Sequence, residues 1–127
     1  METLRIKAFH RSVDDFLQDL VQTFPADYTF GLVQTMVKTF RTSIPEKEAI
    51  KYFWDYIKDY RQEILNEDES FFMADEIIQT VPQAYSTLFH QLRGVWTRSS
   101  TTAQTKSAIF KHTIQLVKIA EMIFGAK

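Results

Sequence analysis

Cysteine is absent from this chain of 127 residues, and glycine and proline occur only three times each. Without cysteine the chain can form no disulfide, no thiolate metal site and no cysteine nucleophile. Phosphate-binding loops and serine-nucleophile motifs need glycines at fixed offsets, and Gly31, Gly94 and Gly125 are too far apart to supply them. These absences exclude several common kinds of enzyme and metal site, and they leave little material for a flexible linker.

Long apolar runs are also missing. No stretch approaches the roughly 18 apolar residues that a membrane-spanning helix needs. The first seven residues mix polar and apolar side chains, so they do not form the apolar core of a secretory signal. We therefore expect a protein without a membrane partner that is not secreted and is located in the cytoplasm, in the nucleus or inside a particle.

Aromatic residues, in contrast, make up 14% of the chain, and phenylalanine alone occurs eleven times. The length fits a single domain spanning residues 1–127, which can build a core without disulfides. The surplus of phenylalanine has two interpretations. It fills the core of a helical fold, which we favour, or it forms an exposed aromatic docking surface.

Apolar residues recur at steps of three and four, the spacing that predicts amphipathic helices, and no long segment alternates as a strand would. Pro25 ends the first helix, because the residue before a proline avoids helical geometry, and Asp27 is expected to cap the next helix. We predict an all-α fold, a compact bundle of five to six amphipathic helices. The expected helices span residues 4–23, 28–42, 45–66, 68–80, 82–96 and 102–124.

The three histidines do not form a metal-binding pattern. His10, His90 and His112 include no pair four residues apart, so no helix offers two imidazoles to one zinc ion. We expect each of them to be solvated or hydrogen-bonded.

The acidic segment 66–70 begins like a helix–loop–helix calcium site, because oxygen-bearing side chains alternate along it. Such a loop requires glycine at its sixth position and a bidentate glutamate at its twelfth. Those positions would be Phe71 and Ile77. The sequence therefore predicts no metal site, and it contains no other pattern that indicates a cofactor or a catalytic residue.

Charge is unevenly distributed, although the net charge is only −1. Residues 62–92 contain six acidic side chains and no lysine or arginine, whereas residues 93–127 contain six basic side chains and one acidic side chain. Lys111 and Lys118 are seven positions apart, so the helical repeat places them on one ridge with Gln115 between them. The acidic stretch also carries Phe71-Phe72-Met73, three large side chains that a short helix cannot bury on one face.

These features suggest a non-enzymatic protein–protein interaction module with a structural or adaptor role. Its partner would be another protein or a second copy of the chain, since the acidic part of one copy attracts the basic part of the next. We expect the contacts to lie on the acidic turn and on the basic ridge. The expected partner-binding residues are Glu67, Asp68, Glu69, Phe72, Arg98, Lys111 and Lys118.

Two alternatives stay open. A nucleic-acid-associated protein would use the basic C-terminal helix, where basic and hydroxyl side chains beside a helix start suit a phosphate. Its contacts would be Arg93, Arg98, Lys106, Lys111 and Lys118. The second alternative is an enzyme whose site is assembled from side chains that are far apart in the sequence.

Three short sequence patterns, located at or near predicted helix ends, occur together in residues 9–73. They are Phe24-Pro25 at the end of the first helix, Ile44-Pro45 before an aromatic helix, and the stretch Asp68-Glu69-Ser70-Phe71-Phe72. In these features the chain resembles short all-helical proteins encoded by large DNA viruses of algae and other protists. The resemblance implies an accessory or structural viral protein, located in the infected cell or in the particle, and it carries over no catalytic residue.

Overall fold

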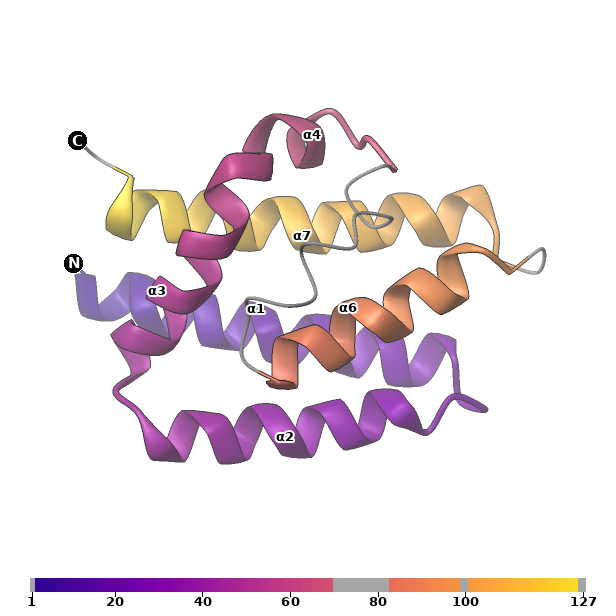
Figure 1. Ribbon diagram of the computed structural model, residues 1–127, viewed down its shortest axis with the longest axis horizontal. Coiled ribbons are helices and arrows are strands. Elements are labelled where there is room, and N and C mark those ends of the chain that lie inside the picture. Colours follow the sequence, from indigo (N-terminus) through magenta and orange to yellow (C-terminus); the bar gives the residue numbers. More distant parts are fainter. Residues whose placement is uncertain (1, 70–82, 99–100, 126–127) are drawn as a thin grey trace.

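The computed structural model describes residues 2–69, 83–98 and 101–125. These residues form an all-α fold, as the sequence predicts, and no strand occurs among them (Figure 1). Most of the helix expected over residues 68–80, including Phe72, lies outside the described residues. The elements are α1 (Glu2–Thr23), α2 (Thr29–Ser43), α3 (Glu46–Ile57), the 3₁₀-helix η1 (Lys58–Tyr60), α4 (Arg61–Leu65), α6 (Gln83–Trp96) and α7 (Ala103–Phe124).

Local chemistry explains where several helices begin and end. Helix α1 stops two residues before Pro25, and the side chain of Thr102 caps α7 by accepting a hydrogen bond from the Thr105 backbone nitrogen at 3.1 Å. The expectation that Asp27 caps α2 is wrong. Tyr28 occupies the cap position without a side-chain hydrogen bond, and the Asp27 carboxylate accepts hydrogen bonds from Arg98.

The single helix expected over residues 45–66 is also wrong from residue 58 onward. Helix α3 ends at Ile57, a 3₁₀ turn follows, and α4 continues in a new direction across α7 (Figure 1). The change of direction buries Ile64 completely. It also lets the Arg61 Nη2 atom donate to Glu121 Oε1 at 3.2 Å, which fastens α4 to the last helix.

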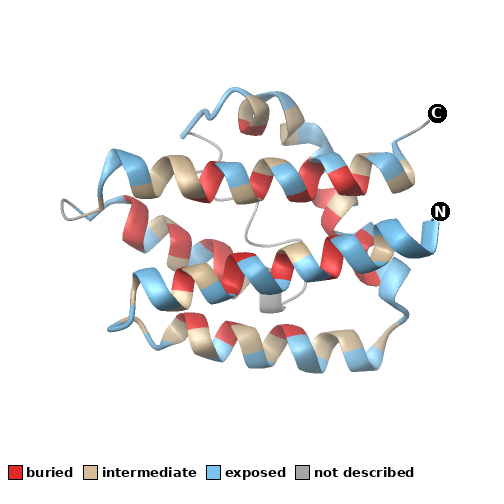
Figure 2. Ribbon diagram, turned by 180° about the vertical axis from the view of Figure 1, so that it is seen from behind, coloured by how far each residue is buried: buried red, intermediate tan, exposed pale blue. Residues whose placement is uncertain are grey.

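The helices are arranged so that α1 lies between α7 and α2. Contacts from Arg5 to Met122 and from Asp19 to His112 show that α1 and α7 run antiparallel. In Figure 2, which shows the molecule from behind, α7, α1 and α2 lie side by side, while α3 and α6 cross on the other side. The two outer helices of this layer, α7 and α2, therefore each present a face to the outside.

One continuous core takes buried side chains from all of these helices except the short η1, whose Tyr60 packs against it. Phe9, Phe30, Ile50 and Leu92 are fully buried in it. None of the phenylalanines that the structure describes is exposed, so the interpretation of the phenylalanine surplus as core is confirmed for this part of the chain. Among the residues with described side chains, the large apolar ones that are exposed are Leu4, Tyr28, Leu32, Tyr52 and Met122.

Candidate interaction surface

The outer face of α7 carries an exposed ridge, which we call the α7 ridge, made of Lys111, Gln115, Lys118 and Met122. Its members follow each other at steps of four, three and four, so they stand in one line along the helix. No acidic side chain interrupts this line. Neither lysine forms an ion pair or a hydrogen bond with the described residues. The α7 ridge is therefore a positively charged line that ends in an exposed apolar side chain.

The antiparallel partner helix α1 supports this ridge from one side. The Gln115 Nε2 atom donates to the Ser12 hydroxyl at 3.2 Å, and the Arg5 Nη1 atom donates to the Met122 backbone oxygen at 3.1 Å. A guanidinium at the carbonyl end of a helix interacts favourably with the helix dipole. Arg5 adds a third positive charge beside the ridge, and sequence reasoning missed it because 117 positions separate the two residues.

Arg98, which sequence analysis placed with these lysines, is engaged elsewhere. Its two terminal nitrogens donate to the two carboxylate oxygens of Asp27 at 2.6 and 2.7 Å. This bidentate pair fastens the end of α6 to the start of α2. The hydrogen bonds from Arg98 lower the pKa of Asp27 below its usual value. Arg98 therefore holds two segments of the chain together, and it does not extend the α7 ridge.

Lys106 and Glu69 meet within the same chain. The Lys106 Nζ atom lies 3.4 Å from Glu69 Oε1 and 5.3 Å from the centre of the Trp96 ring. The Trp96 ring nitrogen donates to the same Glu69 oxygen at 2.5 Å, and this hydrogen bond followed by that of Lys106 lowers the pKa of Glu69. One acid of the acidic stretch, Glu69, is thus paired with a lysine of the same chain.

The five residues predicted to hold nucleic acid consequently do not form one surface. Lys106 and Lys111 are five positions apart on α7, which places them about 140° apart around the helix. Arg93 is half-buried on α6, and Arg98 pairs with Asp27. Lys111 and Lys118, seven positions apart, do share one face of α7.

The acidic turn after α4 has an unusual backbone. Glu67 adopts a left-handed backbone conformation with φ of 54°. Residues that have a Cβ atom adopt this conformation at an energetic cost. The Asp68 nitrogen donates to the Glu63 oxygen at 2.8 Å, and the Glu67 nitrogen donates to the Ile64 oxygen at 3.0 Å. This pair of bonds closes the helix end and leaves the side chains of Glu67 and Asp68 exposed.

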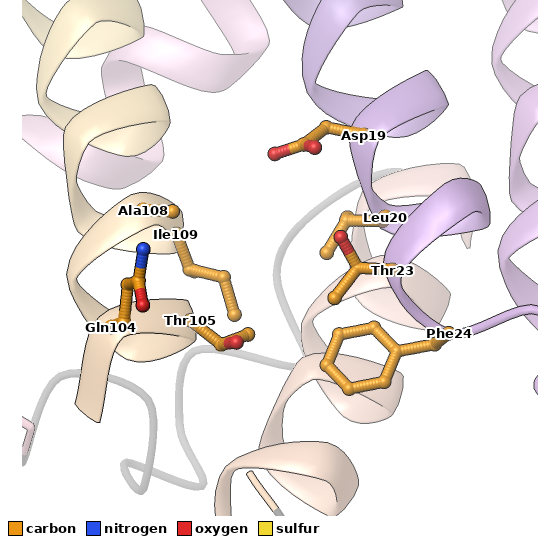
Figure 3. Close-up of a pocket in the computed structure, with 8 residues that line it drawn as sticks. All are labelled: Asp19, Leu20, Thr23, Phe24, Gln104, Thr105, Ala108 and Ile109. Carbon is orange, nitrogen blue, oxygen red and sulfur yellow. The ribbon is translucent and has the colours of Figure 1, made fainter. Parts of the chain in front are cut away.

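A small cavity of about 180 Å³ opens between the end of α1 and the start of α7 (Figure 3). Four apolar side chains line it together with four polar ones, which are Asp19, Thr23, Gln104 and Thr105. Beside it, the His112 Nε2 atom lies 3.1 Å from the Asp19 carboxylate, and this is the only hydrogen bond that the imidazole makes with the described residues. The volume is below that of typical small-molecule sites.

The described part of the chain contains neither a candidate metal site nor a candidate membrane span. Within residues 2–69, 83–98 and 101–125, no three histidine, aspartate or glutamate side chains are grouped so that they could hold a metal ion. In the same part of the chain, no helix is both long enough and apolar enough to span a bilayer. No protein-family model matches the sequence, and no curated protein or solved structure shows significant similarity to the chain.

Proposed function

We propose that this protein is a non-enzymatic protein–protein interaction module, structural or adaptor in role, that contacts an acidic partner through the α7 ridge. The proposal rests on one observation, which is that Lys111 and Lys118 are exposed and form no ion pair among the described residues. Several lysines and arginines pair with acids of their own chain, including Arg41 with Asp14 and Lys47 with Glu2. The two ridge lysines have no such partner among the described residues.

The shape of the ridge suits a helical or extended acidic segment. Lys111 and Lys118 are separated by two helical turns, a rise of about 10.5 Å. Carboxylates seven positions apart on a partner helix have the same spacing. Met122 is 47% exposed at the end of the line, and a flexible thioether adapts to apolar side chains of different shapes. The best partner therefore combines two spaced carboxylates with an apolar residue next to them.

A binding experiment with two probes tests the proposal. One probe is a labelled helical peptide with glutamates seven positions apart followed by leucine, and the other is a labelled single-stranded oligonucleotide of similar charge. Fluorescence anisotropy measured at about 50 mM and about 200 mM salt should show binding of the peptide that weakens as salt rises. The double substitution Lys111→Gln/Lys118→Gln should weaken this binding roughly three- to tenfold.

Lys51 and Lys58 provide a matched control, because they are also exposed and also seven positions apart. Both lie within ion-pair distance of Asp55, so their charges are already offset. The substitution Lys51→Gln/Lys58→Gln should leave peptide binding unchanged. Preference for the oligonucleotide would replace our proposal with the nucleic-acid alternative, and equal losses in both double variants would show that only the net charge matters.

A further inference from the structure

The cavity between the end of α1 and the start of α7 has an apolar inner wall and a polar rim. Leu20 on α1 and Ile109 on α7 are buried and belong to the inner wall. The polar side chains lie nearer to solvent, because Thr23 and Gln104 are exposed and the Asp19 side chain is 48% exposed. In Figure 3 the α1 residues and the α7 residues face each other across this space. A ligand that fits the cavity therefore combines an apolar body with a polar head.

The charge of the rim favours a cation. Among the described residues that line the cavity, Asp19 alone carries a formal charge. Its Oδ2 atom lies 3.1 Å from His112 Nε2, and its other carboxylate oxygen has no hydrogen-bond partner in the described part of the chain. The C-terminal end of α1 and the N-terminal end of α7 both border the cavity, and their helix-dipole charges have opposite signs. The carboxylate of Asp19 therefore determines the charge of the ligand.

The acceptors around Asp19 identify an ammonium group rather than a metal ion. No three acidic or histidine side chains of the described residues are grouped as a metal site of protein ligands would need. A primary ammonium group instead has three N–H donors. Thr23 lies one helical turn after Asp19, so its hydroxyl oxygen is a neighbour of the carboxylate. Gln104 adds an amide oxygen from the facing helix, and the three side chains together offer an acceptor to each donor.

The volume of about 180 Å³ sets the size of the apolar body. For comparison, a cavity of about 150 Å³ with apolar walls holds one benzene molecule. We propose that this cavity binds a small protonated organic amine, with the ammonium group at Asp19 and an apolar body of about six carbons against Leu20 and Ile109. The site does not depend on the acidic partner proposed above, because none of the described residues that line the cavity belongs to the α7 ridge.

Three probes of nearly the same size test the charge of the ligand. Benzylammonium carries the proposed charge, benzyl alcohol is its neutral counterpart, and benzoate is an anion that the N-terminal end of α7 would attract instead. Each probe is titrated into isotope-labelled protein at about pH 8, where histidines carry little charge, and the amide resonances of Thr23 and Ala108 report binding by NMR. We expect a dissociation constant on the order of 1–10 mM for benzylammonium, and binding of benzyl alcohol that is roughly two- to fivefold weaker.

Two pairs of variants test whether the amine binds in this cavity. Asp19→Asn removes the charge but keeps an acceptor for His112, so it should weaken benzylammonium binding to the level of benzyl alcohol. Asp15→Asn, at an exposed acid on the same helix, is its matched control and should leave binding unchanged. Ala108→Leu fills the cavity and should abolish binding of both probes, whereas Ala8→Leu at an exposed position of α1 should not.

Three results would each overturn the proposal. If benzoate bound as tightly as benzylammonium, the start of α7 rather than Asp19 would select the ligand. If Asp19→Asn bound benzylammonium as tightly as Asp15→Asn does, the carboxylate would not hold the ammonium group. If the Thr23 and Ala108 resonances did not shift up to about 50 mM benzylammonium, or if Ala108→Leu bound it fully, the cavity would not be a site for amines.

Discussion

His10 is a buried histidine of α1 whose two ring nitrogens have different surroundings. The Nε2 atom lies 3.0 Å from the Glu46 backbone oxygen. Because a carbonyl oxygen only accepts hydrogen bonds, Nε2 carries the proton and donates it. The Nδ1 atom is buried and has no hydrogen-bond partner among the described residues. A second proton would therefore place a charge on a buried ring and leave the Nδ1–H without an acceptor among the described residues.

This arrangement predicts a pH dependence of stability. Burial lowers the pKa of His10 below its usual value, and the positive charge of Arg41 acts in the same direction, while the hydrogen bond to Glu46 opposes both. Below about pH 6.5 the unfolded chain then binds more protons than the folded chain, so the free energy of unfolding decreases as pH falls. The loss should reach at most about 1.4 kcal/mol per pH unit, measured by urea denaturation between about pH 7 and about pH 5.

Two variants test whether His10 is the source of this pH dependence. His10→Gln removes the buried titrating group and should flatten the pH dependence, whatever its effect on stability at neutral pH. His90 is exposed on α6, so His90→Gln should retain the dependence of the unmodified protein. If His10→Gln lost stability with the same slope as His90→Gln, the buried imidazole would not be the source.

At the scale of the element, the end of α4 stores backbone strain at Glu67. The left-handed conformation at this position is the one that glycine adopts without steric cost. Glu67→Gly should therefore raise the free energy of unfolding by about 0.5–1 kcal/mol, because the relieved strain exceeds the greater entropy of glycine in the unfolded chain. Glu67→Ala removes the carboxylate but keeps the Cβ atom, so it should give no such gain in urea denaturation. Equal stability of the two variants would mean that the conformation is not strained.

Helix ends were predictable where a residue near the end determines them. Proline at position 25 ends α1, and the apolar repeat of three and four locates α2, α6 and α7 within a few residues. The break at η1 was not predictable, because residues 58–60 contain neither glycine nor proline. Packing of Ile64 and Arg61 against α7 is what redirects the chain there, and such packing depends on a helix about 60 residues later in the sequence.

At the scale of the whole molecule, the candidate site was predictable only where it depends on one helix. The spacing of Lys111 and Lys118 placed both on one ridge, and the structure has them there. Arg98 was assigned to the same surface because it is close in sequence, yet it pairs with Asp27, 71 positions away. Sequence also could not show that α1 would place Arg5 beside the ridge, because this contact depends on the tertiary arrangement of the helices.

The single core makes a last prediction about the entire chain. Trp54 on α3 packs against this core and Trp96 on α6 is part of it, although the two helices are far apart in the sequence. If the chain unfolds as one cooperative unit, tryptophan fluorescence and far-UV circular dichroism should give the same midpoint in urea. Trp54→Phe leaves Trp96 as the only tryptophan and should preserve the agreement between the two signals. If the fluorescence and circular dichroism midpoints of Trp54→Phe differed, α6 would unfold independently of the other helices. Residues 1–127 would then comprise more than one folding unit.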